Sequence, residues 1–352
     1  MTRSIAGASR WVAAICLFGA GVVSACSDGT APATPPDFAG QFDAVWSSYD
    51  QTYPYFVYKH VNWDSLRSVY RPRAAAATSE QDLANVVRDM LAELRDLHAW
   101  LTTPSGSAVP TYAPTAFVNW RSSVWQSYIS RFTWQQQNTN WGYGKVDGIP
   151  YLAFGAWNTA QFTSAAIDAA LEQFKNAPAM VIDVRMNGGG NSSLALSIAS
   201  RFYDSTRVVT YVQYRNGPNH SNLGTLQPTS VAPRGPWQFR NPVLLLVGRG
   251  CFSSNETFVA AMSRLPNVTV AGDTTGGASG NPAQFDLGGG WQYTVPRWIE
   301  YTTNLQVIEW KGIAPTIVVR ATAADFDAGR DPVLDYAARW ADSVLALHAA
   351  RN

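Results

Sequence analysis

Apolar side chains recur at helical intervals in the first part of the chain. After Thr78 they return every third or fourth position and so share one face of a helix. They are Leu83, Val86, Val87, Met90, Leu91, Leu94 and Leu97. Because Thr78 and Gln81 have the spacing of a capping box, we expect the helix to begin there and to end near His98. Shorter amphipathic stretches at 43–49 and 66–70 make residues 38–101 a helical block.

Two short apolar runs farther along have a different pattern. The runs at 180–184 (MVIDV) and 243–247 (VLLLV) are continuous, which is typical of strands buried on both faces. Each leads through a loop into a helix-like stretch. Two such strand–loop–helix units predict an α/β fold with a parallel sheet and crossover connections. A strand at 148–154 and a helix at 163–174 are expected before them.

The loops after these two strands lie where parallel sheets bind ligands. One contains Gly188, Gly189 and Gly190, and the other contains Ser253 and Ser254 before a helix. Glycines let the backbone approach a substrate, and a serine at a helix start lies beside amides without intrahelical partners. Such donors suit an oxyanion site for acyl transfer. Taken one at a time, the loops are explained as well by a tight turn and a helix cap.

The segment between the helical block and the sheet is rich in Pro, Ser, Gln and aromatic residues. It contains Trp120, Trp125, Trp134 and Trp141. Residues 106–142 are therefore predicted to form a cap or connector. The cap is either irregular and packed on its own rings, or an apolar wall over a substrate groove.

The first residues have the layout of an export signal. Arg3 and Arg10 precede an apolar run at 11–23 that is short for a membrane span. The small residues before Cys26 resemble the bacterial lipoprotein signal, which implies a signal peptide at 1–25 and a lipid on Cys26. Residues 26–37 then form a Pro-rich tether. Ser27 after the cysteine favours lipid anchoring in the cell envelope, at the outer membrane and facing the periplasm.

Composition narrows the possible functions. Of 352 residues, 46% are hydrophobic and only 14% are charged, with a formal charge of +1. These values argue against a disordered chain and against a nucleic-acid partner. If Cys16 leaves with the signal and Cys26 is acylated, Cys251 remains as the one thiol, and we expect no internal disulfide.

Five motifs in a fixed order carry a family resemblance. They are Asp96-Leu97-His98, the segment 181–190, Ser253-Ser254-Asn255-Glu256, the segment 272–277 and the segment 308–315. Together they resemble the tail-specific, or C-terminal processing, serine peptidases over about residues 40–320. The resemblance implies an N-terminal helical subdomain at 38–105. It also implies a crotonase- or ClpP-like α/β catalytic domain at 143–345.

One missing side chain indicates the branch of that family. The Ser-Lys branch has a lysine where this chain has Ala278, and no lysine lies between Ser253 and Glu309. The chain is more similar to the tricorn core and to the interphotoreceptor retinoid-binding modules, which take their base from a histidine matching His98. A serine precedes that histidine in the tricorn-like pattern, whereas Leu97 does so here. The space at 105–142 is too short for a PDZ domain, so selection by a free C-terminus is not expected.

The resemblance implies a role for each site residue. Ser253 would be the nucleophile, His98 the general base and Glu309 the carboxylate that completes the relay. The amides of Ser254 and of Gly189 or its neighbour Gly188 would hold the oxyanion. The expected substrate is an extended peptide or protein, with no metal and no cofactor, and the oligomeric state is left open. The alternative is a lipoprotein that binds an apolar ligand or a peptide on the same scaffold without turnover.

Four further residues have simpler explanations. Cys251 is expected to be a small buried filler. Asp183 and Arg185 are expected to brace the glycine loop, and Glu300 is a fallback for Glu309.

Overall fold

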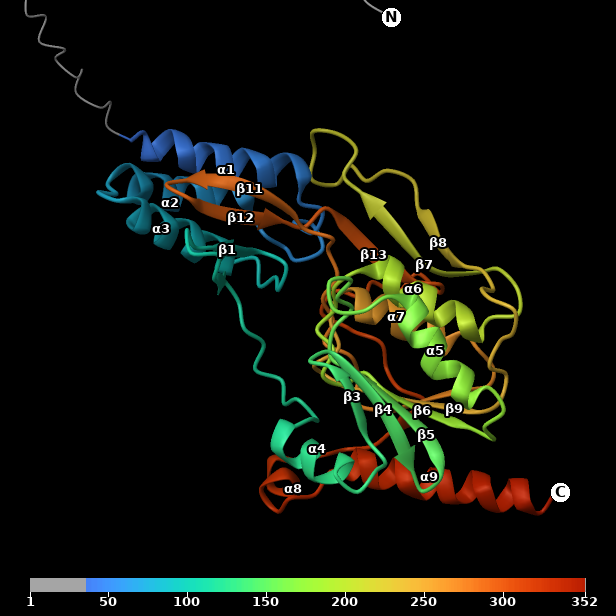
Figure 1. The fold of residues 1–352 in the computed structure, drawn as a ribbon. Helices are drawn as coiled ribbons and strands as arrows, with labels where there is room; N and C mark the ends of the chain where they lie inside the picture. The colour runs from blue at the N-terminus through green and yellow to red at the C-terminus, as the bar shows by residue number, and fades with distance from the viewer. Residues whose placement is uncertain (1–35, 352) are drawn as a thin grey trace, which may run out of the picture. The chain divides into compact units, whose positions relative to one another are not determined.

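The computed structural model describes residues 36–351 and is drawn in Figure 1. The predicted signal peptide, Cys26 and nearly all of the predicted tether lie outside the described residues. Residues Asp37–Asn352 form one compact unit, and the internal domain boundaries predicted above stay predictions. No helix in the described part of the chain is both long and apolar enough to cross a bilayer.

The N-terminal helices share a core with strands from a distant part of the chain. The helices are α1 (Phe38–Thr52), α2 (Trp63–Ala75) and α3 (Glu80–Ala92). The antiparallel sheet beside them has the order β11-β12-β1-β2, with bounds Ala283–Gly288, Trp291–Val295, Trp100–Thr102 and Ala108–Pro110 (Figure 1). Buried side chains of α1, α3 and β12 belong to one apolar cluster. The hairpin β11–β12, which comes late in the sequence, therefore contributes to the core of the helical block.

The helix predicted to run to His98 is shorter than expected. It begins at Glu80, and its N-cap is Ser79, whose Oγ accepts the Asp82 amide at 3.1 Å, in place of the predicted Thr78. It ends at Ala92 because the next residues make tighter turns, such as Arg95 N to Ala92 O at 3.0 Å, and Arg95 has a φ of +46°. His98 therefore lies in the turn between α3 and β1.

A seven-stranded sheet confirms the predicted α/β class. Its order is β14-β10-β9-β6-β5-β4-β3. The bounds are β3 Gln135–Asn138, β4 Trp141–Val146, β5 Ile149–Phe154, β6 Met180–Asp183, β9 Val243–Val247, β10 Val268–Gly272 and β14 Ile317–Val318. Strands β5, β6, β9, β10 and β14 run parallel, whereas β3 and β4 are antiparallel additions at one edge.

Helices cover both faces of this sheet. Helices α5 (Ser164–Phe174), α6 (Ser192–Ala199) and α7 (Ser254–Ser263) pack on one face, and α9 (Pro332–Ala349) on the other (Figure 1). Within β9, Leu245 packs with the first group, whereas Leu244 and Leu246 pack with the second. This alternation explains why the strand reads as an unbroken apolar run.

The aromatic segment at 106–142 is more regular than an irregular cap. It contains α4 (Ser122–Ile129), β3 and the start of β4. The Trp125 ring packs edge-on to Trp134 at 5.4 Å, and its Nε1 donates to the Tyr151 hydroxyl of β5 at 2.8 Å. The segment thus packs on the sheet as well as on its own rings.

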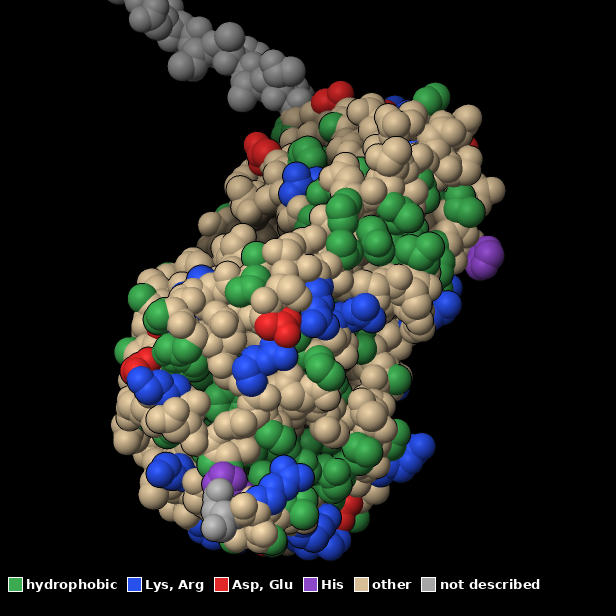
Figure 2. All heavy atoms as spheres, turned by 90° about the vertical axis from the view of Figure 1, so that its right-hand side faces the viewer, with side chains coloured by type: hydrophobic (Ala, Val, Ile, Leu, Met, Phe, Trp, Pro, Cys, Tyr) green, Lys and Arg blue, Asp and Glu red, His purple; other side chains and the backbone are tan. Residues whose placement is uncertain are grey.

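The remaining elements complete the unit. They are β7 (Arg207–Tyr214), β8 (Gln227–Val231), β13 (Trp298–Thr302), α8 (Ala323–Asp327) and a 3-10 turn at Ser200–Phe202. Strands β13, β7 and β8 form a separate antiparallel sheet. On the face drawn in Figure 2, Lys and Arg side chains occur in small groups among polar and apolar ones and form no continuous basic track.

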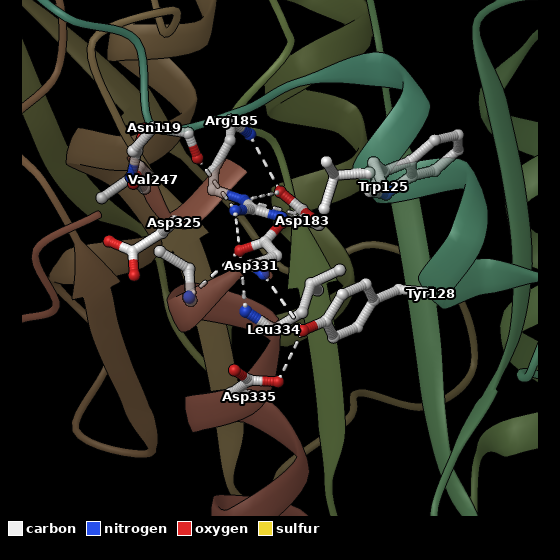
Figure 3. Close-up of polar contacts among 12 residues, drawn as sticks. Asn119, Trp125, Tyr128, Asp183, Arg185, Val247, Asp325, Asp331, Leu334 and Asp335 are labelled. Carbon is white, nitrogen blue, oxygen red and sulfur yellow. Dashed lines mark hydrogen bonds and ion pairs between the residues drawn. The ribbon is translucent and has the colours of Figure 1, made fainter. Parts of the chain in front are cut away.

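A buried arginine at the end of β6 ties three segments together. Arg185 is fully buried, and its Nη2 and Nη1 lie 2.8 Å from Asp183 and 2.9 Å from Asp331 (Figure 3). Nη1 also donates to the carbonyl of Asn119 at 3.0 Å. Asp331 caps α9 by accepting the Leu334 amide. Both Asp183 and Arg185 are buried, and their contacts join the end of β6 to residue 119 and to the start of α9.

Candidate active site

Ser253 has a backbone conformation that side chains rarely adopt. It lies between β9 and the first residue of α7 with φ +57° and ψ −132°. Such a conformation costs about 1–3 kcal/mol and persists only where the surroundings impose it. Position 189 in the facing loop has no room for a side chain, since a Cβ added to Gly189 would lie 2.7 Å from the Ser253 Cβ. Ser253 is therefore held against the glycine loop at the start of a helix.

Polar side chains bind the two loops to each other. Asn255 Nδ2 donates to the carbonyls of Val184 at 3.1 Å and Asn187 at 2.9 Å. The Cys251 thiol donates to the same Val184 carbonyl at 3.2 Å. Cys251 is fully buried, and burial raises the pKa of its thiol, so the residue is the filler that the sequence predicts.

A third loop, at 275–280, holds the amide of the serine. Ser253 N donates to the carbonyl of Ala278 at 2.8 Å. The buried Glu256 carboxyl of α7 accepts from Gly277 N at 3.0 Å and from Ala278 N at 2.7 Å. Burial raises the pKa of Glu256 to about 8, against the opposite effect of these donors. The position that carries a lysine in the Ser-Lys branch thus supplies only backbone contacts here.

The serine and the histidine face one cleft of about 430 Å³. Its lining comes from the turn before β1, both loops and the segment before β11, namely Leu97, His98, Trp100, Gly188, Gly190, Phe252, Ser253 and Pro282. No hydrogen bond joins Ser253 to the His98 ring within the described residues. The fold nevertheless brings the two predicted residues to the same surface. Leu97, in the place of the family serine, is part of the cleft wall.

His98 is fixed by its backbone and left free at its ring. Its N–H donates to Asp96 Oδ1 at 2.8 Å, and its carbonyl accepts from Thr294 Oγ1 at 2.8 Å. The residue is only 6% exposed, and its buried Nδ1 has no partner among the residues described. Burial lowers the pKa of His98 below 6.5, although Asp96 acts in the opposite direction. The imidazole is therefore neutral near neutral pH and able to accept a proton.

The Glu309 carboxyl contacts a lysine. Its Oε1 is 2.6 Å from Lys59 Nζ, and the same ammonium is 2.8 Å from Asp96 Oδ2. All three side chains are essentially inaccessible to solvent. Among the described contacts, none joins Glu309 directly to His98. The path from Glu309 to the histidine runs through Lys59 and Asp96.

The buried cluster contains two carboxyls and one ammonium. Burial, and next the charge of Asp96, raise the pKa of Glu309 to about 8. The Lys59 charge lowers the pKa of Asp96 despite its burial. The two carboxylates in turn raise the pKa of Lys59, although burial alone would lower it. Lys59 is therefore charged, and the cluster depends on it for neutralisation.

Glu300, the fallback for Glu309, serves another contact. Its Oε2 accepts the Ser279 hydroxyl at 2.5 Å, and its Oε1 accepts the Thr257 hydroxyl at 2.9 Å. It does not line the cleft of Ser253. Ser279 also donates its amide to Glu309 Oε2 at 3.2 Å, so both glutamates hold the 275–280 loop.

The three predicted oxyanion donors differ in their availability. Gly189 N already donates to Asn187 Oδ1 at 2.9 Å. The amides of Gly188 and Ser254 donate to no other residue in the part of the chain described here. Gly188 lines the cleft, and Ser254 begins α7, where backbone amides have no intrahelical acceptor.

Sequence reasoning missed the residues that support this site. In the sequence Asp96 stands out only as part of a motif, and Lys59 does not stand out at all. An aspartate two positions before a histidine is a usable signal, because its carboxylate can reach the histidine amide. For Lys59 the sequence offers no signal, since its partners lie 37 and 250 positions away.

Comparison with known proteins gives two family matches. Residues 149–319 match the description "Peptidase family S41", and residues 34–92 match "Tricorn protease C1 domain". Carboxy-terminal processing protease CtpA of Bacillus subtilis is 29% identical over 179 residues, which are 50% of this chain and 35% of that protein. A candidate tricorn protease homolog of Streptomyces coelicolor is 32% identical over 206 residues, 56% of this chain and 15% of that protein. The chain thus spans about a third or less of these curated relatives.

A solved structure extends the likeness to most of the fold. The crystal structure of a candidate peptidase from Parabacteroides merdae is 29% identical, with a TM-score of 0.74. The similarity covers 84% of this chain and 94% of that one. The helical block and the sheet therefore recur together in a related protein.

Lys59→Met should destabilise the protein in a pH-dependent way. The substitution leaves two buried carboxyls without a cation, which raises their pKa values in the folded state above those of the unfolded chain. Stability from such groups is present at low pH and lost as the pH rises, so the variant should lose about 3–5 kcal/mol at pH 8 and less at about pH 5. Urea unfolding at both pH values measures this.

Lys175→Met is the matched control, because Lys175 is exposed beside Glu172. It should lose less than about 1 kcal/mol at either pH. A loss in Lys59→Met that is equally small, or equal at both pH values, would show that the lysine does not neutralise the cluster.

Proposed function

We propose that the chain is a serine peptidase with Ser253 as nucleophile and His98 as general base, because residues 149–319 match peptidase family S41. One observation carries this proposal: a serine with strained backbone at a helix start shares a cleft with a buried, neutral histidine. Strain of this kind concentrates at functional sites, where it fixes a reactive group in place.

The chemistry follows from the protonation of the two side chains. His98 accepts the proton of the Ser253 hydroxyl as the oxygen attacks the carbonyl carbon of a peptide bond. The C–N bond then breaks, and the same proton passes to the leaving amine. Water, deprotonated by His98, hydrolyses the resulting ester and restores the serine. A depressed histidine pKa keeps the base unprotonated near neutral pH, which the first step requires.

The amides of Ser254 and Gly188 are the proposed oxyanion donors. Neither amide has an acceptor among residues 36–351, and both belong to the loops that meet at Ser253. Gly189 would have to release Asn187 Oδ1 before it could act in the same way. Donors fixed before the reaction stabilise the charge that develops on the carbonyl oxygen.

Glu309 is proposed as a positioning residue. Its carboxyl contacts Lys59, which contacts Asp96, and Asp96 accepts the His98 amide. Through these contacts it fixes the turn that carries the imidazole. Ser279 N, which also donates to Glu309, extends the same contacts to the loop that holds the serine amide.

Labelling with a fluorophosphonate tests the proposal. Wild-type protein should react with the probe, Ser253→Ala should lose all labelling, and His98→Ala should slow it by about 100-fold or more. Ser263→Ala, at the exposed far end of the same helix, should label as wild type does. The readout is the rate of adduct formation by mass.

Two results would contradict the peptidase assignment. One is a folded wild-type protein that never reacts, which would favour the non-catalytic binding protein. The other is labelling that survives Ser253→Ala.

We further propose that the protein acts on extended peptides or proteins while anchored in the bacterial cell envelope through a lipid on Cys26. The sequence pattern before Cys26 supports this. When the full chain is expressed in a bacterium, we expect it in the outer-membrane fraction, from which detergent should extract it. Cys26→Ser should leave the protein unlipidated by mass spectrometry. The anchor would be refuted if the Cys26→Ser protein kept the added mass of the lipid and stayed in the membrane fraction.

A further inference from the structure

A second cleft, of about 570 Å³, opens beside the catalytic one. Four tryptophans contribute to its lining, namely Trp120, Trp125, Trp134 and Trp141. Amide side chains complete much of the rest, from Gln126, Gln136, Asn138 and Asn140. These residues lie in or just before α4 and β3, in the turn after β3 and at the start of β4, all within the segment 106–142 that the sequence singled out for its aromatic residues.

The floor of this cleft is formed by residues with little or no side chain. Gly142, Ala153 and Gly155 lie on it, from β4, β5 and the residue after β5. A Cβ on Gly142 would lie 2.4 Å from a ring carbon of Trp134. The glycine therefore allows the indole to lie against the strand. The opposite wall is α4, whose Trp125 packs edge-on to Trp134.

The two clefts lie along the same loops. Met186 lines the second cleft, and Gly188, two residues later, lines the catalytic one. Gly155 lines the second cleft, and Trp157 N donates to Gly189 O at 2.9 Å. Both clefts thus follow the carboxyl ends of β5 and β6. An extended peptide bound across Ser253 and continuing along these loops would therefore reach the second cleft.

The lining selects an uncharged ligand. None of its residues is Asp, Glu, Lys, Arg or His. The indole N–H groups of Trp120 and Trp141 are buried and have no acceptor among the residues the structure describes. Indole faces bind apolar or aromatic groups, and amide side chains pair with peptide N–H and C=O groups. A charged side chain would lose its hydration there without gaining a partner.

We propose that this tryptophan-lined cleft is a specificity subsite that binds an uncharged, preferably aromatic, side chain of the peptide substrate. That side chain lies a few residues from the bond that is cut. The inference rests on the proposed peptidase function and extends it. Continuity with the catalytic loops favours a substrate segment over an independent ligand, because a bound peptide would occupy both clefts at once.

Cleavage of matched peptides tests this subsite. The peptides carry Phe, Gln, Lys or Glu at one position at a time, within four residues of the bond that is cut. At one of these positions, kcat/KM for the Phe peptide should exceed that for the Lys and Glu peptides by about tenfold. Trp120→Ala should reduce that preference. Gln136→Glu should raise kcat/KM for the Lys peptide by about three- to fivefold, since it places a charge opposite an exposed cation.

The matched control is Gln135→Glu, because Gln135 neighbours Gln136 on β3 but does not line the cleft. It should leave the preference unchanged, and fluorophosphonate labelling should be the same in all three variants. Two results would overturn the subsite while leaving the peptidase proposal in place. One is normal labelling and cleavage with no preference at any position. The other is a preference that neither Trp120→Ala nor Gln136→Glu alters. Binding of a neutral oligosaccharide, seen by tryptophan fluorescence without any effect on peptide preference, would overturn the subsite too. Absence of both labelling and cleavage would overturn the peptidase proposal together with the subsite.

Discussion

The position of the histidine depends on a buried ammonium between two carboxyls. Lys59 joins Asp96, which fixes the backbone of His98, to Glu309, which fixes the loop that holds the serine amide. Such a cluster contributes little net stability compared with apolar packing, but it is costly to break. Its effect is to impose one relative placement on segments far apart in the chain. We therefore regard it as the constraint that sets the geometry of the cleft.

The serine is placed by a different device, in which three loops close on one residue. Asn255 and Cys251 bind the loop after β6, and Glu256 binds the loop at 275–280. Gly189 has no side chain, and the Ser253 side chain lies where its Cβ would be crowded. These contacts are almost all to backbone atoms. The strained conformation of Ser253 is stabilised because each neighbouring loop is held independently.

The parts of the structure that follow from local pattern could be predicted from the sequence. Strand β9 matches its apolar run residue for residue, and α5 begins after Thr163 as a capped helix should. Ser253 and His98 could be named only from the order of the family motifs, and the structure brings them to one cleft. The end of α3 was misplaced because Leu94 and Leu97 continue the apolar period after the backbone has left the helix.

Other features depend on contacts between distant residues and leave no trace in a local window. The pairing of β1 with β12 and the contact of Lys59 with Glu309 are of this kind. The helix at 122–129 was hidden because its aromatic side chains pack against both the sheet and neighbouring rings, so no single apolar face stands out.

A crystal structure of the phosphonate adduct would show whether the two side chains work together, because the adduct stands in for the tetrahedral intermediate. We expect the phosphorus to be bonded to Ser253 Oγ, with a His98 ring nitrogen within about 3.2 Å of that oxygen. We also expect a phosphonyl oxygen to accept from the amides of Ser254 and Gly188. An adduct whose phosphonyl oxygen faces solvent, with the imidazole beyond hydrogen-bonding reach, would contradict this expectation.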